Sequence, residues 1–325
     1  MSLSFSEAEA LFGRMLDGGM ADDDIRDLLI ELTDRGETAQ EIAGAAKAMR
    51  DRMSRIAAPA NAIDVCGTGG DGQHSLNIST ATAIVVAACG VPVAKHGNRA
   101  ASSKAGTADT LEALGLNLDR ARQLAEQTLA DIGIAFLFAQ AHHPALKHVM
   151  PIRRAIGRRT IFNLLGPLTN PAGATHQLIG VYDPALTEPL ANVIGGLGGQ
   201  AAFVVHGFGG LDELSTAGRN RISALRSGKV NTFELDPADF NLRSASPDDL
   251  RGGDPAENAI MLRKLLSGED ISPRRDVVLL NSAAALATQH GDFNLAMQEA
   301  EKSLFSGAAL AHLDALISYS QKIVQ

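Results

Sequence analysis

The pattern of hydrophobic and polar positions changes once along the chain, close to residue 60. Before that point the pattern is entirely helical, with helix-start motifs of the Ser-x-x-Glu type at residues 6–9 and of the Thr-x-x-Glu type at residues 38–41. We therefore expect a small all-helical domain over residues 1–60, joined by helices from about residues 144–160.

Beyond residue 60, short apolar segments alternate with glycine loops and helix-length segments, which is the pattern of a parallel α/β domain. The predicted strands are Ile63–Cys66, Val91–Lys95, Ile134–Phe138, Gln177–Tyr182 and Ala201–His206. A hairpin is expected at residues 222–235, and three helices after it. The predicted fold class is α/β, with a large domain over residues 61–325 around a mainly parallel central sheet.

Composition and charge narrow the class of protein. The 325 residues are 45% hydrophobic and 20% charged, as in an ordinary globular protein. A formal net charge of -8 repels phosphate backbones and anionic lipids, so we expect neither nucleic acid nor a membrane as a partner. No export signal is evident, and Cys66 and Cys89 lie in apolar runs typical of buried free thiols, which predicts a cytoplasmic location.

A glycine loop, Gly67-Thr68-Gly69-Gly70-Asp71, lies between the first predicted strand and a helix beginning near Asn77. Glycine lets the backbone come close to a ligand, and the free N–H groups at a helix start attract anions. The loop also fits the dinucleotide pattern G-x-G-x-x-G, but the acidic residue expected about twenty positions later is missing. A Walker motif is excluded too, because no suitably placed lysine precedes a Ser or Thr.

The acid-free stretch after this loop is rich in cations, although the protein is acidic overall. It contains His74, Lys95, His96, Arg99 and Lys104, interspersed with glycine and small residues. A glycine-hinged basic loop over a phosphate group explains this composition, and the alternative is a solvated basic surface.

Hydroxyl and amide side chains gather at the start of the helix after the glycine loop. They are Ser75, Asn77, Ser79 and Thr80. Any one of them is explained as a helix N-cap, but four exceed what capping requires.

Two adjacent carboxylates, Asp212 and Glu213, follow the predicted strand at residues 201–206 and a glycine-rich loop. Carboxylates at the C-terminal end of a parallel strand suit Mg²⁺, which takes few protein oxygens and keeps water and substrate phosphate as further ligands. Acidic neighbours in a loop are more often only solvated, so it is the anion loop upstream that favours metal binding.

Several motifs, read in order, resemble anthranilate phosphoribosyltransferase of tryptophan biosynthesis. They are the glycine loop, Asn77-Ile78-Ser79-Thr80, Lys95-His96-Gly97-Asn98-Arg99, Ser102-Ser103-Lys104-Ala105-Gly106, the segment Thr160–Pro171, and Leu211-Asp212-Glu213. Such long ordered motifs rarely match by chance, and they cover nearly the full chain.

The resemblance implies a fold, a reaction and partners. The fold is the nucleoside phosphorylase and phosphoribosyltransferase type, in which a helical domain is joined to an α/β domain. The substrates are phosphoribosyl pyrophosphate (PRPP) and anthranilate, with Mg²⁺, two ions per subunit, and the implied assembly is a homodimer through the helical domains. The amine of anthranilate displaces pyrophosphate, giving N-(5-phosphoribosyl)anthranilate without a covalent enzyme intermediate.

Matching positions imply the roles of individual residues. Catalysis falls to Lys95, Asp212 and Glu213, and metal binding to Ser79, Asp212 and Glu213. The positions implied around PRPP are Gly67, Gly70, Asp71, Ser75, Asn77, Ser79, Thr80, Lys95 and Ser103. Those implied around anthranilate are Gly67, His96, Asn98, His143, Arg153, Gly166 and Pro167. A guanidinium such as that of Arg153 can bind a carboxylate through two hydrogen bonds.

Other functions fit the sequence less well. A nucleoside phosphorylase on the related fold is disfavoured by the Asp212–Glu213 pair, and a nucleic-acid-binding protein by the net charge. A nicotinamide-dependent oxidoreductase rests on the glycine spacing alone. A zinc site at residues 142–148 lacks a complete ligand set. Without the resemblance, Arg153 is one of four arginines on what reads as a charged helix face.

Overall fold

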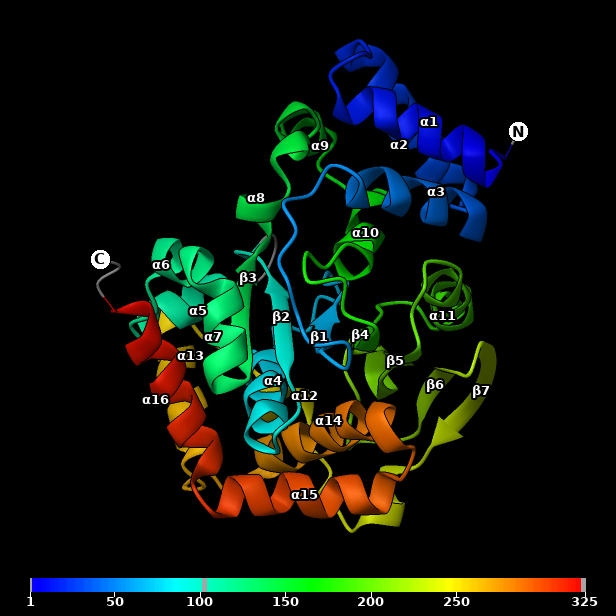
Figure 1. Ribbon diagram of the computed structural model, residues 1–325. Helices are drawn as coiled ribbons and strands as arrows, with labels where there is room; N and C mark the ends of the chain where they lie inside the picture. Colours follow the sequence, from blue (N-terminus) through cyan, green and yellow to red (C-terminus); the bar gives the residue numbers. More distant parts are fainter. Residues whose placement is uncertain (1, 101–103, 323–325) are drawn as a thin grey trace.

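The computed structural model describes residues 2–100 and 104–322, which form a small helical part and a larger α/β part (Figure 1). The helical part contains α1 (Phe5–Leu16), α2 (Asp22–Arg35) and α3 (Ala39–Arg50). The 3-10 helix η1 (Pro144–His148) packs on α1, and α9 (Met150–Ile156) packs on α2. A shared core joins them, in which the Phe12 and Phe162 rings meet edge to face at 5.9 Å.

The motif predicted at residues 6–9 is wrong by two residues, whereas that at residues 38–41 is confirmed. Ser4 caps α1, and the Glu7 side chain accepts a hydrogen bond from the Ser4 backbone N–H at 2.9 Å. The earlier start brings Phe5 against α3, where Gly44 lies so close to the Phe5 carbonyl that a Cβ would overlap it. Contact with α3 therefore decides where α1 begins.

The α/β part is built on a seven-stranded sheet of order β3-β2-β1-β4-β5-β6-β7. The strands are β1 (Ile63–Gly67), β2 (Val93–Gly97), β3 (Ile134–Phe138), β4 (His176–Gly180), β5 (Ala201–His206), β6 (Asn220–Arg226) and β7 (Lys229–Leu235). The first five are parallel, and β6 and β7 add an antiparallel hairpin at one edge. The prediction of a mainly parallel sheet is confirmed.

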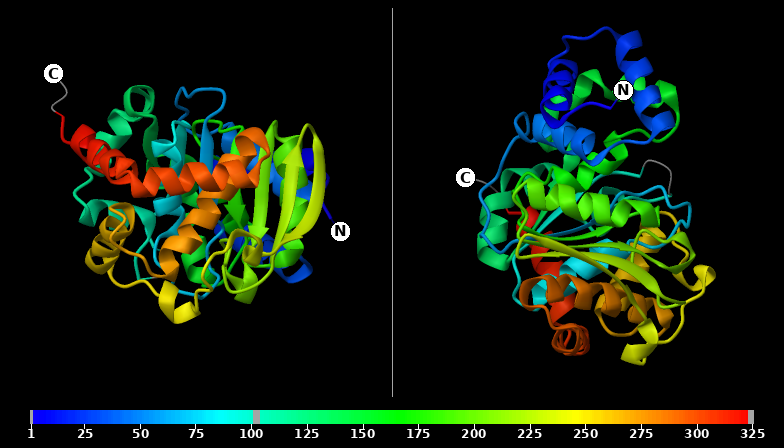
Figure 2. Two further views of the ribbon diagram at one scale, coloured as in Figure 1. Left: turned by 90° about the horizontal axis from the view of Figure 1, so that it is seen from below. Right: turned by 90° about the vertical axis from the view of Figure 1, so that its right-hand side faces the viewer.

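Alternate residues of each strand face different layers of helices. In β5, Phe203 and Val205 belong to the core with α4 (Ile78–Ala88) and α14 (Pro273–His290), whereas Ala202 and Val204 belong to the core with α3 and α11 (Thr187–Gly196). Figure 2 shows α11 and the C-terminal helices on opposite sides of the sheet. Such two-sided burial explains the continuous apolar runs of these strands.

The remaining helices connect the strands or close the chain. They are α5 (Thr107–Ala113), α6 (Leu118–Gln123), α7 (Ala125–Ile132), α8 (Ala139–His142), α10 (Phe162–Leu168), α12 (Pro247–Leu250), α13 (Pro255–Leu266), α15 (Phe293–Phe305) and α16 (Ala308–Ser320), with short 3-10 turns η2 (Pro184–Leu186), η3 (Phe208–Gly210) and η4 (Pro237–Phe240). The prediction of three helices after the hairpin is wrong, since one-turn α12 and four longer helices follow it. Asp254 caps α13 and Ser272 caps α14, so these two helices begin independently.

Several strand boundaries also differ from the prediction by one or two residues. β2 begins at Val93 rather than Val91, because the backbone of Val93 is the first to pair with β3, opposite Ile134. β4 ends at Gly180 rather than Tyr182, and the importance of that glycine is described below. Cys66 and Cys89 are free thiols, the first buried and the second partly so. None of the helices in the described residues has the length and apolar character needed to span a membrane.

Candidate active site

The candidate site lies where the direction of strand addition in the sheet reverses. β1 is flanked by β2 on one side and β4 on the other, and Gly67 at its end pairs with Gly180 at the end of β4. In open parallel sheets, ligands bind beyond the C-terminal ends of the strands at such a reversal. The loops after β1, β2 and β5 carry most of the residues that the sequence singled out.

The glycine loop after β1 is held against the carboxylate loop after β5. The Gly69 backbone N–H donates to the Asp212 carboxylate at 2.7 Å, and the Asp212 N–H donates to the Asp71 carboxylate at 3.4 Å. Gly69, Gly70 and Gly72 have φ between +69° and +76°, a region that favours glycine. Residues separated by about 140 positions in the sequence are thereby joined in one site.

Three strand-ending glycines allow this close approach. A Cβ on Gly67 would overlap the Asp212 carboxylate, one on Gly180 the Asp212 backbone carbonyl, and one on Gly207 the Glu213 carbonyl. Gly180 and Gly207 were not predicted as site residues. Their position immediately at or after the ends of predicted strands was the signal that could have revealed them.

Asp212 and Glu213 are buried carboxyl groups whose charged forms repel each other. Burial raises the pKa of Glu213 well above its usual value, and Asp212 raises it further, whereas Lys95 acts in the opposite direction. Burial and then Asp71 raise the pKa of Asp212. A cation bound between these groups would favour their charged forms and offset the repulsion.

Hard oxygen donors of this kind fit Mg²⁺. Within the described residues, no group of three or more His, Cys, Asp or Glu side chains has the arrangement of a complete metal site. Mg²⁺ needs no such protein cage, since it usually keeps water and phosphate oxygens beside one or two carboxylates. The Asp212–Glu213 pair therefore suits this ion better than a metal that requires a full set of protein ligands.

A side chain of α14 holds the carboxylate loop, the segment after β5 that contains Asp212 and Glu213, by hydrogen bonds. The Asn281 side chain accepts a hydrogen bond from the Leu214 N–H and donates one to the Leu214 carbonyl, both at 2.9 Å. Sequence reasoning missed Asn281, because a buried asparagine in an apolar helix is not adjacent to the loop in the sequence. Both backbone groups of the residue after Glu213 are thus satisfied by one side chain.

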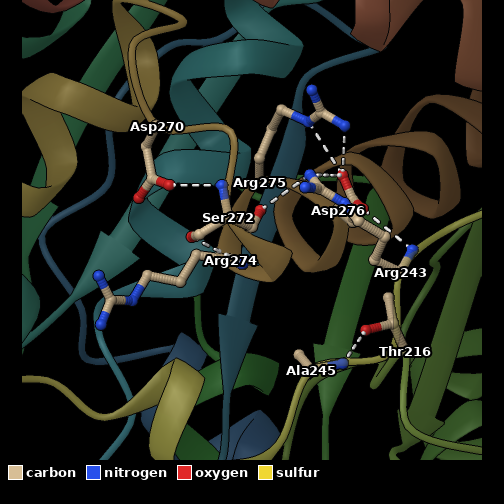
Figure 3. Close-up of polar contacts among 8 residues, drawn as sticks. All are labelled: Thr216, Arg243, Ala245, Asp270, Ser272, Arg274, Arg275 and Asp276. Carbon is tan, nitrogen blue, oxygen red and sulfur yellow. Dashed lines mark hydrogen bonds and ion pairs between the residues drawn. The ribbon is translucent and has the colours of Figure 1, made fainter.

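A second support is a polar network at the start of α14 (Figure 3). The Ala245 N–H donates to the Thr216 hydroxyl at 3.0 Å, which ties the end of the carboxylate loop to residues 243–246. The Arg243 guanidinium bonds the buried Asp276 carboxylate at 2.8 Å, and Arg275 bonds it from the other side. Burial raises the pKa of Asp276, but the bonds from Arg243 and Arg275 outweigh this and lower it.

Lys95 is buried between two acidic groups. Its ammonium donates to the His96 carbonyl at 3.3 Å, and its charge favours the ionised forms of both Asp64 and Glu213. The fully buried Asp64 carboxylate, on the neighbouring strand β1, accepts the His96 backbone N–H at 3.0 Å. This arrangement fixes Lys95 next to the carboxylate loop, as its predicted role requires.

The polar residues at the start of α4 serve different purposes. Asn77 occupies the N-cap position, but its side chain caps nothing and instead accepts from the Thr110 hydroxyl at 2.6 Å and from the Asn258 amide at 3.1 Å. Thr80 donates to the Thr107 hydroxyl at 3.2 Å. Ser79 is half-buried, as is Ser75, whose backbone forms an isolated bridge with that of Arg251. Capping therefore does not explain this group of residues.

The predicted basic cluster is only partly present. Arg99 forms ion pairs with Asp109 at 2.8 Å and with Glu112 on α5, so its charge is neutralised within the protein. Burial lowers the pKa of His96 to about 3, so this side chain is uncharged at neutral pH. The other predicted cations are the buried Lys95, the exposed His74 and Lys104. Ser103, expected near PRPP, lies outside the described residues.

Four of the residues predicted around anthranilate, His96, His143, Gly166 and Pro167, lie in α10 or near it. His96 Nδ1 lies 3.1 Å from the Gly166 carbonyl, and the His96 and His143 rings are 5.3 Å apart. Both Nε2 atoms are buried without a hydrogen-bond partner in the described residues, and burial lowers the pKa of His143 to about 4. Pro167 follows Gly166 within α10. The group is thus apolar with neutral acceptors, as suits an aromatic amine.

Two other predicted residues lie at the margin of this group. Arg153 stacks on the Phe162 ring, with its guanidinium 5.1 Å from the ring centre, and has no ion pair among the described residues. Burial lowers the pKa of Arg153, so a carboxylate ligand would find a poorly solvated cation there. Exposed Asn98 accepts the Arg99 N–H at 2.8 Å. The structure also places Arg159, which was not predicted, against Gly70 of the glycine loop.

The chain is similar to known proteins over nearly its full length. Residues 1–53 match the family described as "Glycosyl transferase family, helical bundle domain", and residues 59–310 match "Glycosyl transferase family, a/b domain". The anthranilate phosphoribosyltransferase of Novosphingobium aromaticivorans is 57% identical over 97% of this chain and 96% of its own length. That of Sphingopyxis alaskensis is 54% identical over 98% of this chain and 96% of its own.

Solved structures agree with these relatives. The crystal structure of anthranilate phosphoribosyltransferase from Thermus thermophilus has a TM-score of 0.92 at 39% identity, and covers 99% of this chain and 97% of its own. The enzyme from Saccharomyces cerevisiae, solved in complex with PRPP and Mg, has a TM-score of 0.89 at 29% identity, with 99% and 94% covered. The yeast enzyme was also solved with 4-fluoroanthranilate.

Proposed function

This chain belongs to the anthranilate phosphoribosyltransferases, and we propose how its own residues carry out the reaction. The enzyme transfers the 5-phosphoribosyl group of PRPP to the amine of anthranilate, forming N-(5-phosphoribosyl)anthranilate and pyrophosphate in tryptophan biosynthesis. The observation that carries the residue assignment is the hydrogen bond from Gly69 to Asp212, which joins an anion-binding loop to a carboxylate pair.

Magnesium is the metal that this carboxylate pair suits. Asp212 and Glu213, with the Ser79 hydroxyl, are proposed to hold two ions per subunit. Bound Mg²⁺ stabilises the negative charge that develops on the departing pyrophosphate. Support comes from the raised pKa values of the two buried carboxyl groups, because a bound cation relieves the repulsion that causes them.

PRPP is proposed to lie over the glycine loop and the start of α4. Lys95 and the backbone N–H groups of Gly70 and Asp71 stabilise charge on the leaving group without needing to reorganise. Further groups proposed around PRPP are Gly67, Gly70, Asp71, Ser75, Asn77, Thr80 and Ser103. Bond breaking leaves positive charge on the ribose, and the attacking nucleophile is the amine of anthranilate. The enzyme therefore needs positioned charges rather than a nucleophilic side chain of its own, and no covalent intermediate is proposed.

Anthranilate is proposed to lie between Gly67 and the group of residues at α10. Arg153 would bind its carboxylate, while His96, His143, Gly166 and Pro167 surround the ring, with Asn98 at the margin. The neutral imidazoles can accept hydrogen bonds from the amine, because their Nε2 atoms have no partner in the described residues. Water is excluded by the same burial that lowers their pKa values.

The organisation of the chain supports a further set of proposals. We divide it into a helical domain of residues 1–60 with residues 144–160 and an α/β domain of residues 61–325 without that insertion. The helical domain is proposed to form the contact of a homodimer, and the enzyme is proposed to act in the cytoplasm. Analytical ultracentrifugation of the intact protein tests the homodimer directly. A monomer at micromolar concentration would refute the proposed dimer.

The decisive test of function is the loss of anthranilate fluorescence with purified protein, PRPP and Mg²⁺. Wild type should consume anthranilate only when both PRPP and metal are present, and Asp212→Ala should reduce the rate at least a hundredfold, as expected when a metal ligand is removed. Asp239→Ala, an exposed aspartate in η4, is the matched control and should leave the rate unchanged. Consumption that does not require metal would refute the role of Asp212. Cleavage of a nucleoside with inorganic phosphate, without anthranilate consumption, would instead establish the phosphorylase alternative.

A further inference from the structure

Arg159, in the segment between α9 and α10, is in contact with the glycine loop. A Cβ added to Gly70 would lie 2.8 Å from both Nε and Nη2 of the Arg159 guanidinium, so the guanidinium covers the Cα of that glycine. The nearest guanidinium atoms to Gly70 are thus those of its Nε–Nη2 edge, while the central carbon of the guanidinium lies 3.6 Å from the centre of the Tyr182 ring, just beyond β4. The side chain is therefore held between an aromatic ring and the proposed phosphate loop.

The backbone at this position is anchored to the helical domain. The Thr33 hydroxyl of α2 lies 3.4 Å from the Arg159 carbonyl, which accepts its hydrogen bond. The neighbouring Arg158 pairs with Asp34 of α2 at 2.7 Å. Two consecutive arginines thus have different partners: Arg158 faces the helical domain alone, whereas the Arg159 side chain reaches across to the α/β domain.

The charge of Arg159 is not neutralised within the described residues, where it has no carboxylate within ion-pair distance. This distinguishes it from two other cations of the site. Arg99 is paired with Asp109 and Glu112, and Lys95 lies buried next to acidic groups. The Arg159 guanidinium is half-buried on the Tyr182 ring and lies beside the glycine loop, so it is suited to a ligand with two or more anionic oxygens.

We propose that Arg159 binds the diphosphate group of PRPP, together with the glycine loop, and that Tyr182 holds its guanidinium in place. This inference rests on the proposed function, which it deepens by adding a residue to the leaving-group site. Arg159 contributes a guanidinium that can donate two hydrogen bonds to neighbouring phosphate oxygens. Its anchoring to α2 makes the diphosphate site depend on contact between the two domains.

The test compares Arg159→Gln with the matched control Arg158→Gln, since each removes one positive charge from adjacent positions. Arg159→Gln should raise the KM for PRPP by about tenfold to a hundredfold, the effect of losing a charged hydrogen bond, and change the KM for anthranilate less than about threefold. Arg158→Gln should change neither constant. Arg159→Lys keeps the charge but not the planar fork, so it should recover only part of the loss.

A binding measurement separates this proposal from the function as a whole. Calorimetric titration with inorganic pyrophosphate and Mg²⁺ should show an affinity about tenfold weaker for Arg159→Gln than for wild type. Tyr182→Leu keeps the cation and removes its platform, and should weaken pyrophosphate binding by a smaller factor. This variant and Arg159→Lys give the result even if Arg159→Gln does not fold.

Unchanged pyrophosphate binding in folded Arg159 variants would overturn the proposal, whatever their rate of turnover. Equal weakening by Arg158→Gln would overturn it as well, because a general effect of net charge would then suffice. Failure of the wild type to consume anthranilate would refute the proposed function instead. The pyrophosphate titration remains readable in that case, so the two failures are distinguishable.

Discussion

Replacement of Gly180 by alanine tests whether close backbone approach creates the metal site. Gly180 ends β4, and its φ lies outside the left-handed region, so an alanine backbone is itself unstrained there. A Cβ would nevertheless overlap the Asp212 carbonyl and lie 3.2 Å from the Glu213 nitrogen. Because packed heavy atoms prefer about 3.5 Å or more, the carboxylate loop would have to move by roughly 2 Å.

That displacement has two expected costs. Forcing one extra methyl group into a packed site costs about 1–3 kcal/mol of stability. Misplacing reacting groups by about 1 Å lowers rates by roughly a hundredfold. We expect Gly180→Ala to lose about a hundredfold in kcat and to need more Mg²⁺ for half-maximal rate, because the 2.7 Å bond from Gly69 to the Asp212 carboxylate is also disturbed.

The assay is anthranilate fluorescence with a Mg²⁺ titration, combined with urea unfolding. The control is Gly196→Ala at the exposed end of α11, where a Cβ meets nothing within 4 Å. An alanine there should leave kcat unchanged and add up to about 1 kcal/mol of stability. A Gly180→Ala enzyme with wild-type kcat and an unshifted Mg²⁺ requirement would refute the reasoning, since the loop would then tolerate the displacement.

Two further changes probe the support and the charge state of the site. Asn281→Ala removes the side chain that bonds the Leu214 N–H and carbonyl, so it should cost roughly 2–4 kcal/mol of unfolding free energy and raise the Mg²⁺ requirement. Urea unfolding measures the first effect and a Mg²⁺ titration of the rate measures the second. An unchanged Mg²⁺ requirement would contradict the positioning role of Asn281. Burial lowers the pKa of His143 to about 4 in the folded protein, below the ordinary 6.5, so its contribution to stability is complete above pH 6.5 and is lost as the pH falls toward 4. His143→Gln should therefore show a loss of stability between pH 6.5 and 4.5 that is shallower than wild type by up to about 1.4 kcal/mol per pH unit, and equal slopes would contradict this.

Local sequence patterns were sufficient for the class of fold and for singling out the glycine loop and the carboxylate pair as candidates. The helical start, the alternation of strands and helices and the mainly parallel sheet follow from the spacing of apolar residues, which each segment carries independently of the rest. The glycine loop and the carboxylate pair were recognisable because each is a continuous motif. For the helices and strands, errors were confined to segment ends, such as the start of α1, and to the closing helices, whose number was predicted too low.

Which distant side chains meet was decided only by the tertiary structure. Arg99 reads as a free cation in the sequence, yet α5 brings Asp109 and Glu112 to neutralise it. Arg159 reads as one charge among four, yet chain folding places it against Gly70. These outcomes depend on contacts between segments far apart in the chain. The free energy of each contact depends on how deeply the charges are buried and on the distance between them. No local pattern contains either quantity, so the charges available to a ligand became known only once the sheet had brought its loops together.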